Sequence, residues 1–294
     1  MIAMDIKFFF GQTPLIVKDN PSLLQGCPQT QRLGFPDVVF PGAKRNDLYV
    51  KLWTGDFNSS GGGSIRMRKG MSSFGVGGSS TTSQSYQVNV EVRTREGIVL
   101  DQAISRAGQP PIRSFPSLVF AKNVGPTFGE LVKISNIPPD IMGGCHLFFT
   151  FRQRAPTRDK TTPTDSAGLE RPFAFAFLPL VPEEGASFVP DGDHTLILYK
   201  TDKPTQVLAS QYLDAPSSLS YGASIETVRI PSQMNRLLVP LRDSMIVRTF
   251  LCSTTFTQSE VLLRLLNWEK QGLLDNTAEL TAVLKQFTFV SEGA

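Results

Sequence analysis

The segment of residues 86–93 constrains the fold of this chain more than any other part of the sequence. Its side chains alternate, with Tyr86, Val88, Val90 and Val92 on one side and Gln87, Asn89, Glu91 and Arg93 on the other. Successive side chains of a strand point to opposite faces of a sheet. The segment therefore predicts a β-strand with one buried face and one solvated face.

More strand-like runs, separated by Gly, Pro and Asp turns, lie between Arg45 and Lys200. They are residues 47–53, 98–100, 117–120, 128–134, 146–151, 172–180 and 195–199. No helical pattern interrupts them. With residues 86–93 they make about eight short strands, which is typical of an all-β, antiparallel sandwich.

The remaining segments suggest a division into four parts. Proline punctuates residues 1–44, which we interpret as a lead-in segment, and residues 45–204 form the predicted sandwich domain. Residues 205–240 are polar and contain proline, so we interpret them as a linker. Residues 241–294 are predicted to be the α-helical start of a further region.

Two short helices are predicted in that last part. The first covers residues 257–272, where Thr257 and Glu260 have capping-box spacing and Gly272 is suited to the C-terminal end. The second starts at Asn276 or Thr277 and runs through Phe287. Two short amphipathic helices cannot bury their apolar faces alone, so they predict the beginning of a larger helical domain.

The composition excludes several classes of protein. The 294 residues have 40% hydrophobic content and a net charge of only +3, so any electrostatic binding surface has to be local. The three cysteines, Cys27, Cys145 and Cys252, are far apart and odd in number, which favours a reducing compartment over a disulfide framework. The sequence contains no membrane-spanning run and no signal peptide, so we expect membrane contact to be peripheral at most.

Catalytic chemistry has little support in the sequence. The two histidines, His146 and His194, lie in no metal or nucleophile motif, and we interpret them as structural or solvent-facing. The Gly-rich residues 61–70 lack the terminal Gly-Lys-Ser/Thr of a phosphate-binding loop. We predict no catalytic residue, no metal site and no cofactor.

Two connections are rich in positive charge. The first, residues 58–85, is dominated by Gly and Ser, contains no acid and carries Arg66, Arg68 and Lys69. The second, residues 151–172, carries Arg152, Arg154, Arg158, Lys160 and Arg171 against Asp159, Asp165 and Glu170. Arg and Lys are the groups that bind phosphate oxygens, which predicts a phosphate site. Alternatively, the charges only keep two solvated loops soluble, and composition alone slightly favours that interpretation.

Calcium is a further ligand to consider for a sandwich with membrane-facing loops. Such a site needs several carboxylates that converge from loops. The first basic loop offers only Asp56 at its root, and Asp191 and Asp193 lie in a simple turn. We predict no calcium requirement.

Several long blocks, in order, resemble the C2-type DOCK homology region of the dedicator-of-cytokinesis family. They are GFPDVVFPGAKRNDLYVKLWTGDF (34–57), VNVEVRTREGIVL (88–100), HLFFTFRQR (146–154), PFAFAFLPL (172–180) and DGDHTLILYK (191–200). FLCSTTFTQSEVLLRLLNWE (250–269) is similar to the family's entry into its helical-repeat region.

The resemblance implies a C2-type sandwich that binds phosphoinositides, especially the trisphosphate. Its role would be to bring a cytoplasmic guanine-nucleotide exchange factor for Rac/Cdc42-type GTPases to the plasma membrane. The family's lipid-binding loops correspond to the two basic loops here, although the first is longer and richer in Gly and Ser, so Arg66, Arg68 and Lys69 correspond by position only. The catalytic exchange region has no counterpart in this chain.

Two other classes of function stay open. A protein-interaction scaffold would use the exposed apolar faces of the helical tail and bind no lipid. A sugar- or nucleic-acid-binding sandwich has weak support, because the basic loops lack the interleaved aromatic residues that stack bases, apart from Phe74.

Overall fold

Strand β2 (Ser85–Arg93) buries every second side chain, which confirms the alternation seen in the sequence. The computed structural model describes residues 42, 44–57, 85–106, 110–120, 123–154, 170–182, 186–220, 222–234, 238–267 and 277–286. Tyr86, Val88, Val90 and Val92 are at most 1% exposed. The opposite face of the strand carries the polar residues, as a half-buried strand requires.

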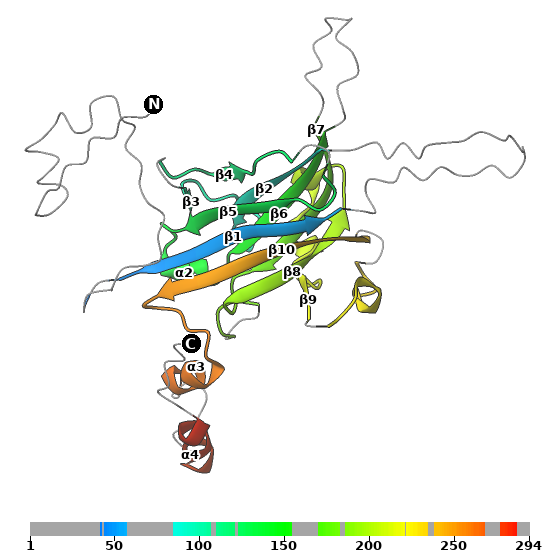
Figure 1. Ribbon diagram of the computed structural model, residues 1–294. Coiled ribbons are helices and arrows are strands. Elements are labelled where there is room, and N and C mark those ends of the chain that lie inside the picture. Colours follow the sequence, from blue (N-terminus) through cyan, green and yellow to red (C-terminus); the bar gives the residue numbers. More distant parts are fainter. Residues whose placement is uncertain are drawn as a thin grey trace, which may run out of the picture.

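The described part of the chain is built mainly from antiparallel strands. Besides β2 they are β1 (Asn46–Asp56), β3 (Ile104–Ser105), β4 (Ser114–Pro116), β5 (Thr127–Ile134), β6 (His146–Arg154), β7 (Glu170–Pro179), β8 (Gly192–Lys200), β9 (Ser218–Leu219) and β10 (Pro240–Ser253). Their order is β3-β5-β1-β10-β8-β7-β6-β2-β4, with β9 paired to β8. The path folds back where only two residue pairs join β7 to β8, so β5, β1, β10 and β8 lie over β2, β6 and β7 (Figure 1).

The main hydrophobic core fills the space between these two layers. One layer supplies Leu48, Val50, Leu52, Met245 and Val247, and the other supplies Val88, Val90, Leu147 and Phe149. All are fully buried. The predicted antiparallel sandwich is therefore confirmed, with apolar side chains of both inner faces in contact.

A second hydrophobic core lies on the outer face of β6, β7 and β8. There Phe148, Phe175 and Tyr199 are covered by the chain between β8 and β10, which contributes Tyr212 and Leu238. This chain contains the short 3₁₀ helices η2 (Pro204–Gln206), η3 (Ala209–Gln211) and η4 (Ile225–Thr227). The prediction of a linker at 205–240 is wrong for the described residues, because they form a third layer, which we call the covering segment.

Strand β10 lies in the middle of its layer, between β1 and β8. The sandwich therefore does not end at residue 204, and residues 241–253 are a strand rather than the start of a helical region. The alternation is hidden in the sequence because Asp243 and Thr249 are polar, yet point inward and are buried.

Two helices follow β10, as predicted, but with different ends. Helix α3 (Glu260–Leu266) begins after Ser259, whose hydroxyl accepts a hydrogen bond from the Leu262 N–H; Thr257 is not its cap. Helix α4 (Thr277–Gln286) begins at one of the two predicted residues. A third short helix, α2 (Pro139–Met142), precedes β6. None of the described helices is both long and apolar enough to cross a membrane.

Smaller differences concern the predicted strands at 98–100 and 117–120. Val99 forms only an isolated bridge with Arg93, and Phe120 forms one with Tyr86. Strand β4 lies just before the second of these segments. The predicted lead-in at 1–44 falls outside the described residues, except for Gly42 and Lys44.

Candidate functional site

The two basic connections leave the sandwich from neighbouring strands. The first joins β1 to β2, and the second joins β6 to β7. Ser85 of β2 pairs with Arg154 of β6, which in turn pairs with Glu170 of β7. Since paired strands lie about 4.8 Å apart, three of the four points where the connections meet the sheet are adjacent. Figure 1 shows these strand ends on the same side of the sandwich, which we call the loop end.

The fourth attachment point, at the end of β1, is held by a cluster of aromatic rings. The fully buried Phe57 ring lies 4.6 Å from Tyr86, 5.8 Å from Phe151 and 6.2 Å from Phe173, measured between ring centroids. The Tyr86 hydroxyl also donates a hydrogen bond of 3.3 Å to the Phe57 carbonyl. Phe57 directly follows β1, and the other three rings belong to β2, β6 and β7, the strands that carry the connections. We call these four residues the root cluster, and it fixes both connections to one rigid base.

The root cluster requires an irregularity in β7. Arg152 pairs with Pro172 while Phe151 pairs with Ala174, so Phe173 is an extra residue in the strand. Such a bulge redirects a side chain without ending the strand. Here it places the Phe173 ring against Phe57, Tyr86 and Phe151.

Two of the predicted site residues belong to β6 rather than to a loop. The pairing with β2 continues through Arg152 and Arg154, beyond the predicted strand end at 151. Arg152 is half-buried and lies on the face opposite to Phe151, because neighbours in a strand alternate. Its Nε is buried and has no hydrogen-bond partner among the described residues. The backbone of Arg154 ends β6 at the loop end.

The other predicted lipid-binding residues stay predictions. Arg66, Arg68, Lys69, Arg158 and Lys160 lie outside the described residues. What the structure describes is the position of the strand ends to which their segments connect.

Two exposed cations at the loop end were not predicted from the sequence. Lys200 pairs with Ala174 of β7, next to the root cluster, and Lys203 follows it on the same exposed turn. The neighbouring Thr201 N–H donates to the Phe173 carbonyl at 3.0 Å. In the sequence these lysines are far from both basic connections, and only the pairing of β7 with β8 brings them close.

The two histidines are held by contacts within the protein. Burial lowers the pKa of His146 to about 4, and its Nε2 lies 2.7 Å from the Tyr212 hydroxyl oxygen. Burial also lowers the pKa of His194, whose Nε2 lies 2.8 Å from Thr249 Oγ1 and 3.0 Å from the Pro190 carbonyl. Both are therefore neutral at pH 7, in keeping with the structural interpretation.

Asp191 and Asp193, the carboxylates weighed as calcium ligands, also have protein partners. Asp191 accepts hydrogen bonds of 2.8 Å from the Leu251 N–H and from the Gln258 side chain. Asp193 pairs with the Arg248 guanidinium, with 2.5 Å between Oδ1 and Nε. No group of three or more metal-binding side chains occurs in the described ranges.

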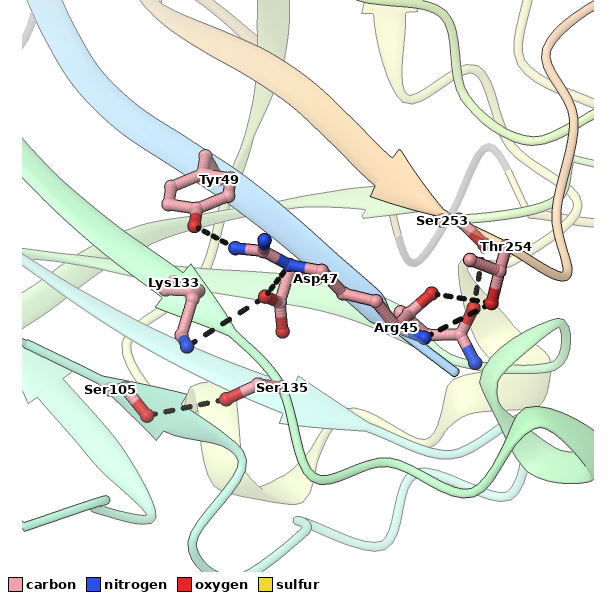
Figure 2. A network of polar contacts seen from close by, with 9 residues as sticks. Arg45, Asp47, Tyr49, Ser105, Lys133, Ser135, Ser253 and Thr254 are labelled. Atoms are coloured by element: carbon pink, nitrogen blue, oxygen red, sulfur yellow. Dashed lines mark hydrogen bonds and ion pairs between the residues drawn. The ribbon is translucent and has the colours of Figure 1, made fainter. Parts of the chain in front are cut away.

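At the end of the sandwich opposite to the loop end, Arg45 and Lys133 are both paired with Asp47 (Figure 2). Asp47 accepts a hydrogen bond of 2.8 Å from Arg45 Nε, and Lys133 Nζ lies 3.8 Å away. Arg45 also donates to the Tyr49 hydroxyl at 3.0 Å. These contacts join β1 to β5, so the cations here serve the fold.

Comparisons with known proteins agree with this architecture. A family model described as the C2 domain in Dock180 and Zizimin proteins matches residues 41–261, a range that includes β10. Dedicator of cytokinesis protein 4 from Homo sapiens is 30% identical over 270 residues, which cover 91% of this chain and 12% of that protein. Dedicator of cytokinesis protein 3 from Mus musculus is 32% identical over 272 residues, with the same two coverages.

The chain thus spans about an eighth of the length of these relatives (12%). Among solved structures, a C2 domain of plant Extended Synaptotagmin 1 is 13% identical, and the match covers 72% of this chain and 98% of that chain. Its TM-score is 0.33, which is too low to support any conclusion.

Proposed function

This chain belongs to the family described as the C2 domain in Dock180 and Zizimin proteins, and we propose that it is a phosphoinositide-binding, membrane-targeting module. The module would serve a guanine-nucleotide exchange factor for Rac/Cdc42-type small GTPases. It binds the headgroup, with the trisphosphate as the expected lipid, through the two basic connections at the loop end. We propose no nucleotide-exchange activity for these 294 residues by themselves.

The observation that supports this proposal most is the adjacency of Ser85, Arg154 and Glu170 in the sheet. Two segments that are rich in Arg and Lys connect to the loop end of the sandwich, next to the root cluster. Each cation near an anionic membrane contributes about 1 kcal/mol of attraction. Charge-assisted hydrogen bonds from Arg and Lys to phosphate oxygens add selectivity for the headgroup.

The proposal includes calcium-independent binding and a cytoplasmic protein that is recruited to the plasma membrane. The protein contacts of Asp191 and Asp193 support the first point, since these carboxylates would have to give up their partners to bind a metal. EDTA should leave binding to liposomes unchanged, whereas loss of binding in EDTA would contradict a calcium-independent mode.

Liposome flotation with and without phosphatidylinositol trisphosphate tests the lipid site. Two triple variants reverse its charges: Arg66→Glu/Arg68→Glu/Lys69→Glu and Arg154→Glu/Arg158→Glu/Lys160→Glu. Each should reduce trisphosphate-dependent flotation by about tenfold or more, because several phosphate contacts are lost together. Unchanged flotation of a folded variant would remove that connection from the site.

A matched control separates a local site from the net charge of the protein. Lys44→Glu/Arg113→Glu/Lys285→Glu changes the charge by the same amount at described, exposed positions away from the root cluster. It should float like the parent protein. If all three triple variants lose binding equally, attraction is a property of total charge and not of the loop end.

A protein-interaction scaffold without lipid binding is the second candidate. It is favoured by the exposed leucines of the two helices, Leu266 at 64% and Leu284 at 50% exposure. Flotation against a panel of phosphoinositides distinguishes the two functions. A scaffold would show no binding that depends on the phosphate pattern of the lipid.

A further inference from the structure

Three valines are exposed at the loop end, beside the strand ends to which the basic connections attach. Val119 is 38% exposed, Val124 41% and Val239 50%. Single apolar side chains scattered over a surface need no explanation. These three lie at one end of the sandwich, however, and backbone contacts with the root cluster and with an exposed lysine place them there.

Two of the valines belong to the chain between β4 and β5, which passes from one layer of the sandwich to the other. We call its described residues, 117–120 and 123–126, the crossover loop. Phe120 and Tyr86 exchange backbone hydrogen bonds of 3.0 and 3.1 Å, and the Phe57 N–H donates to the Val124 carbonyl at 2.8 Å. The crossover loop is therefore tied to two stacked residues of the root cluster.

Further contacts hold the crossover loop in place. The Phe120 ring lies 5.0 Å from the Phe128 ring of β5, measured between centroids. The Gly55 N–H of β1 donates to the Pro126 carbonyl at 2.9 Å, and Pro126 is buried. Val119 and Val124 thus have fixed positions before any ligand arrives, so binding through them costs little ordering entropy.

The third valine, Val239, lies on the other side of the loop end, just before β10. The Lys200 N–H donates a hydrogen bond of 2.9 Å to its carbonyl. This valine is therefore adjacent to the exposed turn on which Lys200 and Lys203 flank a single acid, Asp202. Residues 117–129, which include the crossover loop, contain no acid. The loop end thus presents apolar side chains together with cations.

A lipid bilayer offers contacts for both kinds of side chain. Its surface carries anionic headgroups, and the boundary with the acyl chains lies directly below them. A protein surface that enters this zone gains from apolar burial in addition to charge attraction. A phosphate-bearing ligand that is free in water would be attracted to the cations but would bury none of the valines.

We infer that Val119, Val124 and Val239 enter the boundary between headgroups and acyl chains while the basic connections hold the headgroup. The inference rests on the proposed lipid site and deepens it, because it adds an apolar contribution that the charge-reversal variants do not measure. Through these valines the module distinguishes a membrane from a free inositol phosphate with the same phosphate pattern.

Flotation on vesicles of phosphatidylcholine, phosphatidylserine and phosphatidylinositol trisphosphate tests the inference with the 294-residue chain. The variant Val119→Ser/Val124→Ser/Val239→Ser keeps every charge. Its affinity for the vesicles, from flotation over a range of lipid concentrations, should fall about tenfold, because three side chains lose the gain of apolar burial. Its Kd for free inositol tetrakisphosphate, measured by calorimetry, should equal that of the parent, which also shows that the variant is folded.

The matched control replaces three exposed aliphatic side chains near the opposite end. It is Ile98→Ser/Ile141→Ser/Leu208→Ser, at positions with 63%, 38% and 62% exposure. They lie in the turn after β2, in α2 before β6, and beside Ala209, which contacts that turn. The control should bind vesicles like the parent. Equal weakening by both triple variants would assign the effect to the whole apolar surface and overturn the inference.

Salt separates the apolar contribution from the charges. The ratio between the affinities of the parent and of the valine variant should stay constant as salt is raised, because burial of apolar groups is not screened. The ratio between the parent and Arg66→Glu/Arg68→Glu/Lys69→Glu should shrink. An effect of the valines that disappears with salt would overturn the inference.

A depth probe reports the insertion directly. In a Cys27→Ser/Cys252→Ser background, a fluorophore on Val124→Cys should be quenched by phospholipids brominated on their acyl chains. The same fluorophore on Ile141→Cys should not be quenched. Bound protein without quenching at Val124→Cys would overturn the inference.

The inference and the proposed function fail in different ways. If the parent does not prefer vesicles with trisphosphate over vesicles without it, the proposed function fails and the inference fails with it. If the parent does prefer them and the valine variant binds equally well, only the inference fails. The same holds if the valine variant also loses affinity for free inositol tetrakisphosphate, because the valines would then act through the headgroup site.

Discussion

At the scale of the residue, the loop end depends on a few buried rings. Phe57 is the last described residue before the first basic connection, and its side chain contacts residues of three other strands. The predicted strand at 47–53 stops short of Phe57, and the sequence does not identify this residue as the meeting point of both connections. That role follows from pairings between residues separated by dozens of positions.

Replacing Phe57 by Ala should destabilise the protein by about 3–5 kcal/mol, because it leaves a large cavity among the rings of the root cluster. Urea unfolding measures the change. Phe250→Ala is the control, since that ring is 38% exposed and its removal leaves no closed cavity. An equal loss of unfolding free energy in both variants would show that the Phe57 ring stabilises the protein no more than the partly exposed Phe250 ring does.

Stability should also depend on pH through His146. Its pKa falls from 6.5 in the unfolded chain to about 4 when it is buried. The unfolded state therefore binds the proton more strongly, so protonation of this histidine favours unfolding. The free energy of unfolding falls as the pH decreases from 6.5 toward 4. Between pH 7 and pH 5 this histidine accounts for a loss of about 2 kcal/mol.

His146→Gln keeps a polar partner for Tyr212 but cannot be protonated in this range. Its free energy of unfolding should fall by less between pH 7 and pH 5 than that of the parent chain. The same pH dependence in both proteins would assign the effect to other groups, such as His194, whose pKa is lowered in the same direction.

At the scale of the element, the sequence predicts what local patterns encode. The alternation of β2 and the aromatic run of β6 predicted their strands, and the N-cap of α3 is Ser259, two residues from the predicted cap. Strand β10 was missed because Asp243 and Thr249 replace apolar residues on its buried face. The apolar residues of the covering segment show no regular spacing, because this mostly irregular segment buries isolated side chains such as Tyr212 and Leu238. Its sequence therefore resembled that of a linker.

The central position of β10 predicts the outcome of truncation. A chain of residues 1–204 lacks the strand that pairs with both β1 and β8, so it should be insoluble or lack a cooperative unfolding transition. A chain of residues 1–267 retains every described strand and should unfold cooperatively. Circular dichroism with thermal unfolding checks both. A folded, cooperative 1–204 fragment would show that β10 is dispensable.

At the scale of the whole molecule, the two ends of the sandwich differ in how their charges are used. Arg45 and Lys133 at one end are paired with Asp47, whereas Lys200 and Lys203 at the loop end are exposed. The sequence revealed the basic connections but not their relative position, because that depends on the register of β2, β6 and β7. Together with the proposed lipid site, this arrangement predicts an end-on orientation at a membrane.

Labels at the two ends should report that orientation. Cys252 is partly exposed and pairs with Asp47, about 30 Å along β1 from Asp56. In a Cys27→Ser background, a nitroxide on Cys252 should stay accessible to a water-soluble relaxation agent when the protein binds liposomes. A nitroxide on Asp56→Cys should become protected from it.

Cys145 should not interfere with this labelling. Burial raises the pKa of its thiol to about 11, so little of the reactive thiolate is present at neutral pH. Protection of the Cys252 label instead of the Asp56→Cys label would mean that the protein binds by its opposite end.

The place of β10 in the chain has a consequence for how the protein is made. Asn46 of β1 and Ser253 of β10 share a hydrogen bond although 207 positions separate them. During synthesis, β1 and β8 therefore leave the ribosome before β10, the strand that lies between them in the sheet. Until then both strands expose edges that can pair with other chains. Folding of the sandwich should thus be completed in a single late closure step, and molecular chaperones would matter most just before it.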